Sequence, residues 1–144
     1  MLKTESHMRF HLVAGLFAIG FCAKFYSLTP AQWGVLILTI SAVFVTEIFN
    51  TVLERVCDTV TTEYSKNIEF IKDVSAGAVL VTAVSSVIIA FFMLFDIEVF
   101  KSIFYHFKNN IADLILLLIG TIVSLLFIIV KPENYLKFFR RKNN

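Results

Sequence analysis

The sequence predicts an all-α fold, a polytopic bundle of transmembrane helices, from its composition and from the spacing of its apolar segments. Hydrophobic residues make up 58% of the chain and the mean hydropathy is +0.80, far above the usage of soluble domains. A helix needs about 20 mainly apolar residues to cross a hydrocarbon layer. The segments of that kind are 11–28, 33–60, 74–95 and 114–130. The formal charge of +2 is too small to indicate a nucleic-acid partner, so we expect none.

The first span, 11–28, has Lys24 and Tyr26 near its far end, where snorkelling and aromatic anchoring are expected. A tight connection follows it. Thr29 is suited to cap the next helix and Pro30 to occupy its first position. These residues predict a second helix that starts at Pro30.

The second helix is expected to run to Thr61, which gives a length of about 48 Å. This exceeds the hydrocarbon thickness of about 30 Å, so its C-terminal turns should emerge from the membrane. We predict a polar loop over 62–71 and a third helix that opens at Lys72 and Asp73. The small residues 75–78 would let a backbone or a ligand approach closely.

Residues 96–110 are expected to form a polar, aromatic-rich interfacial connection, followed by the fourth span and a basic tail. Lysine and arginine concentrate on the cytoplasmic side of membrane proteins. With the N-terminus inside, ten of the 13 lysines and arginines face the cytoplasm. The outer side then holds Lys24, Lys101 and Lys108.

The end of the second helix carries a polar stripe that organises the rest of the chain. Glu47, Asn50, Glu54 and Asp58 are spaced i, i+3, i+7 and i+11, so they share one helix face. Ionisable groups in or beside a hydrocarbon layer are costly and usually mark a functional site. The predicted orientation places this stripe at the cytoplasmic side.

The residue types of the stripe fit phosphate chemistry. One or two carboxylates commonly share Mg²⁺ with substrate phosphates, and a nearby lysine supplies positive charge for those phosphates. A deeper carboxylate such as Glu47 can act as general base toward an alcohol. The sequence has no GxxxxGK[ST] or GxGxxG motif, so any nucleotide site is non-standard. The residues alone indicate an ion- or phosphate-handling site, with phosphoryl transfer as one option.

Residues 47–58 resemble the signature E-[IL]-x-N-[ST]-x-[IL]-E-x-x-x-D of the small prokaryotic integral-membrane lipid kinases, the diacylglycerol and undecaprenol kinase family. Further pieces of the family pattern follow at the family's spacing, namely Glu63-Tyr64, Lys72-Asp73 and residues 77–80. Segment 5–11 resembles the part of the family sequence that precedes the first span. The resemblance implies a three-helix lipid-kinase core over residues 1–95. Residues 96–144 then add the interfacial connection, a fourth transmembrane helix and a basic tail.

The resemblance implies an ATP- and Mg²⁺-dependent kinase for a lipid alcohol, assembled as a homotrimer in the bilayer of a bacterial inner or plasma membrane. Glu47 would be the general base and Asn50 would position the reacting groups. Glu5 and Glu54 would ligate the metal that bridges the ATP phosphates. The other ATP contacts would come from Asp58, Glu63, Tyr64, Ser65, Lys72 and Asp73. The residues that would line the approach of the lipid are His7, Arg9, His11, Glu47 and Ala76.

Two departures from the family pattern leave alternatives open. Only four residues precede Glu5, where relatives usually carry an amphipathic surface helix, so reduced activity or a truncated start is one expectation. The other departure is the fourth span, which returns the C-terminus to the inside.

His11 stands where undecaprenol kinases tend to have histidine, which favours undecaprenol over diacylglycerol.

Three other interpretations compete with the kinase. An inert membrane protein explains Asp58 but leaves Glu47 and Asn50, which follow a nearly apolar run, without a reason. A small proton-coupled transporter would place its acids near the membrane midplane rather than beside a lysine at one end. A non-catalytic protein of kinase ancestry stays open because of the short N-terminal segment.

Overall fold

The computed structural model describes residues 6–60 and 65–129, and within these ranges it contains five helices and no strand. The helices are α1 (Ser6–Phe25), α2 (Pro30–Val60), α3 (Lys66–Leu94), α4 (Ile97–Asn109) and α5 (Ile111–Ile129). Except for α4, all of them are long and apolar enough to cross a membrane. The predicted all-α, polytopic architecture is therefore confirmed.

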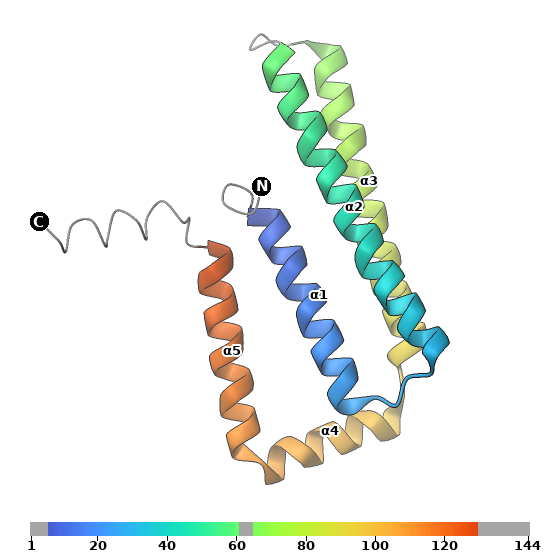
Figure 1. Cartoon of the computed structure of the whole chain (residues 1–144), viewed down its shortest axis with the longest axis vertical. Helices are drawn as coiled ribbons and strands as arrows, with labels where there is room; N and C mark the ends of the chain where they lie inside the picture. The colour runs from blue at the N-terminus through green and yellow to red at the C-terminus, as the bar shows by residue number, and fades with distance from the viewer. Residues whose placement is uncertain (1–5, 61–64, 130–144) are drawn as a thin grey trace, which may run out of the picture. The chain divides into compact units, whose positions relative to one another are not determined.

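The helices form two packing units, one made of α2 and α3 and the other of α1, α4 and α5. In the first unit α2 and α3 run antiparallel along each other (Figure 1). The hydroxyl of Tyr26, just before α2, donates a hydrogen bond to the carbonyl of Leu94 at the end of α3, at 2.8 Å. The division of the chain at residue 95 into a kinase core and an appended segment stays a prediction.

The start of α2 confirms Thr29 as its capping residue. Thr29 Oγ1 accepts a hydrogen bond from the backbone N–H of Gln32 at 3.3 Å, and Gln32 Oε1 accepts one from the N–H of Thr29 at 2.8 Å. This reciprocal pair is a capping box, which satisfies backbone donors that the first turn of a helix leaves open. Gln32 was not singled out from the sequence, although a glutamine three residues after a threonine is the sequence pattern of a capping box.

The predicted loop over 62–71 is wrong from Lys66 onward, because α3 already begins there. The less exposed positions of α3 include Ile68, Lys72, Ser75 and Val79, spaced i, i+4, i+7 and i+11. The helical period therefore starts at Ile68, in front of the apolar run. The polar residues between these positions lie on the exposed side of the same helix.

In the second unit α1 and α5 lie beside each other and α4 crosses one end of the pair (Figure 1). The segment expected as a connection is thus a 13-residue helix. Asp96 caps it, since its side chain accepts hydrogen bonds from the N–H groups of Glu98 and Val99. His106 and Phe107 of α4 bring their ring centroids to 5.4 and 5.6 Å from that of Phe25 in α1.

An ionic cluster joins the three helices of this unit. Lys24 Nζ of α1 and His106 Nε2 of α4 each lie 2.7 Å from Oδ2 of Asp113 in α5. The side chain of Asp113 is 34% exposed. The far end of α1, where Lys24 was expected to snorkel, is thus held by a specific partner.

Candidate functional site

The polar stripe of α2 continues a buried face of the helix. Leu36, Val43, Glu47 and Thr51 are all buried and succeed one another at intervals of seven, four and four residues. Glu47 is only 4% exposed. Along the stripe the side chains then become more accessible, since Asn50 and Glu54 are half-buried and Asp58 is exposed. The sequence predicted that Glu47 is the deepest acid of the stripe. In the structure Glu47 is also the least exposed of the four side chains, and Asp58 is the most exposed.

A chain of hydrogen bonds links the stripe to α3. The hydroxyl of Ser75 donates to Oδ1 of Asn50 at 2.7 Å, and Nδ2 of Asn50 donates to Oε1 of Glu54 at 3.2 Å. Asn50 therefore has both ends of its amide engaged. Its NH₂ group carries a second hydrogen that a bound substrate can accept. The result is that Glu54 presents its carboxylate in a defined orientation.

Lys72 and Asp58 form a second link between the same helices. Lys72 Nζ donates to Oδ1 of Asp58 at 2.5 Å. An ammonium group has three hydrogens, so Lys72 can keep this partner and still donate to a phosphate oxygen. Lys72 and Ser75 are three residues apart and share the α3 face that meets α2.

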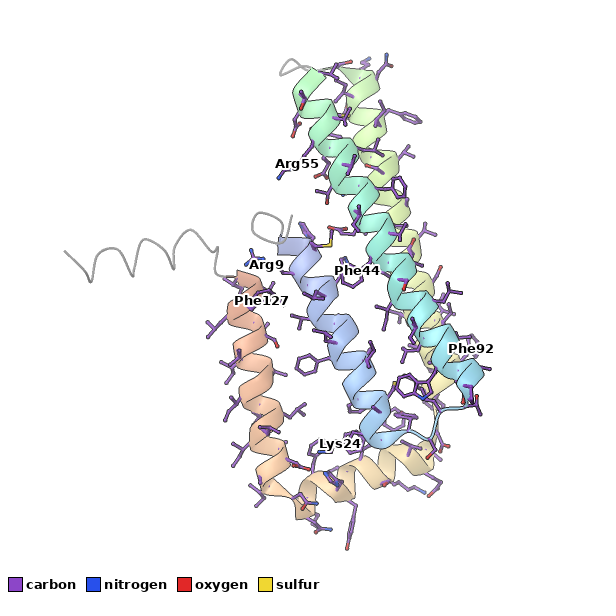
Figure 2. All side chains as sticks on the ribbon, in the orientation of Figure 1. Arg9, Lys24, Phe44, Arg55, Phe92 and Phe127 are labelled. Carbon is purple, nitrogen blue, oxygen red and sulfur yellow. The ribbon has the colours of Figure 1, made fainter. Side chains whose placement is uncertain are left out.

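The residues that were expected to approach the lipid from α1 belong to the other packing unit. Within that unit Arg9 and Phe127 lie at the same end of α1 and α5 (Figure 2). Arg9 is 1% exposed, and its Nη1 donates to the carbonyl of Phe127 at 2.7 Å. Its guanidinium carbon is 5.8 Å from the centroid of the Phe127 ring. His7 is exposed and His11 half-buried.

The remaining predicted site residues either lie outside the described residues or belong to α3 and its start. Glu5, Glu63 and Tyr64 lie outside the described residues. Ser65 is the capping position of α3 and its carbonyl accepts the N–H of Glu69. The side chains of Asp73 and Ala76 are exposed on α3. Their contacts to nucleotide or lipid stay predictions.

The donor set fits a metal ion that is shared with a substrate. Within residues 6–60 and 65–129 no group of three or more His, Cys, Asp and Glu side chains is placed to hold a metal. Mg²⁺ is usually held by one or two carboxylates together with phosphate oxygens and water. Glu54, half-buried and oriented by Asn50, suits that role.

Sequence reasoning missed the contribution of Ser75. It was seen only as part of a run of small residues, yet its hydroxyl is buried, 7% exposed, and bonded to a predicted site residue. Its position three residues after Lys72 was the available signal, because it puts both side chains on one helix face. Which residue of α2 it meets depends on the pairing of α2 with α3, which the sequence does not display.

Comparison with known proteins identifies the family. The profile of the family "Prokaryotic diacylglycerol kinase" matches residues 1–94, a range that ends with α3 and leaves α4 and α5 outside. The chain is 34% identical over 87 residues to an undecaprenol kinase of Bacillus subtilis, covering 60% of this chain and 70% of that protein.

A diacylglycerol kinase of Synechocystis is 37% identical over 87 residues, which is 60% of this chain and 49% of that protein. The match thus spans about half the length of this second relative. No solved structure gives a significant match to the chain. Since the family profile covers well over half of the sequence, the chain belongs to the prokaryotic diacylglycerol kinase family, whose members are membrane lipid kinases.

Proposed function

We propose that this protein transfers the γ-phosphate of ATP to the hydroxyl group of a lipid alcohol, with Mg²⁺ as the metal. The observation that carries the proposal is the arrangement of the α2–α3 pair. It sets a buried carboxylate, Glu47, on the same helix face as an oriented carboxylate, Glu54. A lysine, Lys72, is fixed beside that face through Asp58.

These residues supply the parts of a phosphoryl transfer. Glu47 takes the proton of the lipid hydroxyl as that oxygen attacks the γ-phosphorus. The bond from the γ-phosphorus to the bridging oxygen breaks, and ADP leaves. Lys72 donates to the phosphate oxygens, and Asn50 holds the reacting groups in line. Glu54 would hold Mg²⁺ when it is bound, with Glu5 as the second ligand that the family resemblance implies, and the metal would supply positive charge against the phosphates.

Undecaprenol is the favoured acceptor and diacylglycerol the second. The two relatives carry one name each and differ little in identity, so they do not separate the two lipids. His11 supports undecaprenol, as the sequence suggested. The product would be undecaprenyl phosphate, or phosphatidate with the second lipid.

The setting of the reaction belongs to the same proposal. The apolar helices support a multi-pass protein, for which we propose the bacterial inner or plasma membrane. The lysine and arginine distribution supports a site at the cytoplasmic side. A homotrimer, as the resemblance implies, would allow a site to be completed between neighbouring subunits. The ion pair of Lys72 with Asp58 at one end of the α2–α3 pair argues against a transporter, whose coupling acids belong near the midplane.

The test is transfer of labelled γ-phosphate from ATP to undecaprenol and to diacylglycerol in mixed micelles with Mg²⁺. Glu47→Gln should lower turnover by on the order of 10²- to 10⁴-fold, the range for loss of a general base, while ATP still binds. Glu98→Gln, an exposed acid of α4, is the matched control and should behave as the wild type. Unlabelled lipids from well-folded wild-type protein would instead support a non-catalytic member of the family.

A further inference from the structure

We infer that Ser75 is a positioning residue for this phosphoryl transfer: its hydroxyl fixes the Asn50 amide so that the NH₂ group of Asn50 orients Glu54 toward the metal. The inference rests on the proposed function and adds a residue that the family signature of α2 does not include. It stands on two hydrogen bonds, from the Ser75 hydroxyl to Asn50 Oδ1 at 2.7 Å and from Asn50 Nδ2 to Glu54 Oε1 at 3.2 Å.

The direction of donation in this chain of hydrogen bonds follows from the chemistry of the three side chains. An ionised Glu54 only accepts hydrogen bonds, so the side of Asn50 that faces it must be the NH₂ group. The carbonyl oxygen of Asn50 then faces Ser75 and needs a donor. The Ser75 hydroxyl is that donor, and the opposite orientation of the amide would set two acceptor oxygens against each other.

The surroundings of Ser75 make this contact costly to lose. The residue is 7% exposed, so water does not readily replace its hydroxyl. The same hydroxyl also lies 2.9 Å from the carbonyl of Lys72 in its own helix. With Ser75 changed to alanine, the Asn50 oxygen loses its donor on α3 and the amide can rotate. Glu54 would then be oriented less well, although every proposed ligand is still present.

The first experiment measures the metal site without relying on turnover. Binding of Mn²⁺ in the presence of ATP is followed by the EPR signal of free Mn²⁺, on the full-length protein in detergent without lipid. Ser75→Ala should weaken Mn²⁺ binding about fivefold, the usual effect of one lost hydrogen bond. Ser75→Thr, which keeps the hydroxyl, should bind as the wild type does.

Ser86→Ala is the matched control. Ser86 lies on the same helix, and its hydroxyl is 2.7 Å from the carbonyl of Ala83, three residues earlier, just as the Ser75 hydroxyl is 2.9 Å from the carbonyl of Lys72. Its removal deletes the comparable backbone contact without touching Asn50. Metal binding by this variant should equal that of the wild type.

A double-mutant cycle tests whether Ser75 acts through Asn50. In the Asn50→Ala background, Ser75→Ala should cause no further loss of Mn²⁺ binding. In turnover assays Ser75→Ala should raise the Mg²⁺ concentration for half-maximal rate about fivefold and leave the KM for lipid unchanged. The inference is overturned if Ser75→Ala binds Mn²⁺ as tightly as the wild type does, whether or not its melting temperature falls. It is also overturned if Ser75→Ala weakens Mn²⁺ binding equally with Asn50 present and with Asn50→Ala.

The two proposals fail in different ways. If the wild type transfers phosphate and Ser75→Ala matches it in metal dependence, only the role of Ser75 is wrong. If the wild type neither binds Mn²⁺ with ATP nor labels a lipid, the proposed function is wrong and the role of Ser75 falls with it.

Discussion

Lys72 of α3 is held by Asp58 of α2, with its Nζ 2.5 Å from Oδ1 of that carboxylate. The side chains are 37% and 67% exposed, and exposed ion pairs typically add only about 0–1 kcal/mol to stability. The pair therefore matters less for holding α2 and α3 together than for where it keeps the ammonium group.

Lys72→Met tests whether that ammonium group serves ATP. Removal of one hydrogen bond to a charged phosphate should raise the KM for ATP about tenfold to hundredfold. The melting temperature should change little, because the pair is exposed. Steady-state kinetics at varied ATP and a melting curve measure both. A KM for ATP equal to that of the wild type would show that Lys72 does not contact the nucleotide.

Asp58→Asn separates the two partners of this ion pair. Lys72 keeps its charge in this variant but loses its fixed position, so the KM for ATP should rise by less than in Lys72→Met. The same kinetic assay ranks the two variants. A larger effect of Asp58→Asn would mean that Asp58 itself makes the more important contact with the nucleotide.

Glu54→Ala should raise the Mg²⁺ requirement or eliminate activity. Loss of a metal-supporting group commonly costs on the order of 10- to 100-fold in metal affinity or activity. The rate is measured over a wide range of Mg²⁺ at saturating ATP, with Glu98→Gln as control. An unchanged Mg²⁺ dependence would remove Glu54 from the metal site and leave Glu5 as the remaining candidate.

Asp113→Asn should destabilise the unit of α1, α4 and α5 without affecting catalysis. The substitution weakens the contacts of Lys24 and His106 to one carboxylate. Because these side chains are about a third or more exposed, the loss of stability should be small. Melting of the detergent-solubilised protein measures it, and the KM values for ATP and lipid should not change.

Glu98→Gln gives the comparison for Asp113→Asn. It breaks a more exposed pair with Lys101 inside α4, at 65% and 74% exposure, which joins no two helices. Its melting temperature should equal that of the wild type. A shift as large as that of Asp113→Asn would mean that the Asp113 cluster has no special part in joining the helices.

The sequence predicted the elements of this fold better than their pairing. Apolar length alone marks helices that can cross a membrane, and Thr29 with Pro30 marked the start of α2. The start of α3 was missed because hydropathy falls before Lys72, whereas the helical period already begins at Ile68. The polar stripe was readable because its spacing is local to one helix. The partners of Asn50 and Lys72 were not, since they depend on how α3 is placed against α2.

Deletion of the chain after Phe95 tests the predicted catalytic core of residues 1–95. The family profile ends at residue 94, so the truncated protein should still transfer phosphate to lipid. It should also melt at a lower temperature, because α1 loses two contacts to α5. These are the hydrogen bond from Arg9 to the Phe127 carbonyl and the ion pair of Lys24 with Asp113.

The truncated and full-length proteins are compared by labelled-phosphate transfer and by size-exclusion chromatography in the same detergent. Asp113→Asn in the full-length chain is the matched control, since it removes the ion pair of Lys24 while α5 stays in place. A truncated protein that elutes as a single species and labels lipid confirms that α4 and α5 are an addition to the core. A protein that aggregates, while Asp113→Asn stays folded, would show that α5 is part of the core because α1 needs it to pack.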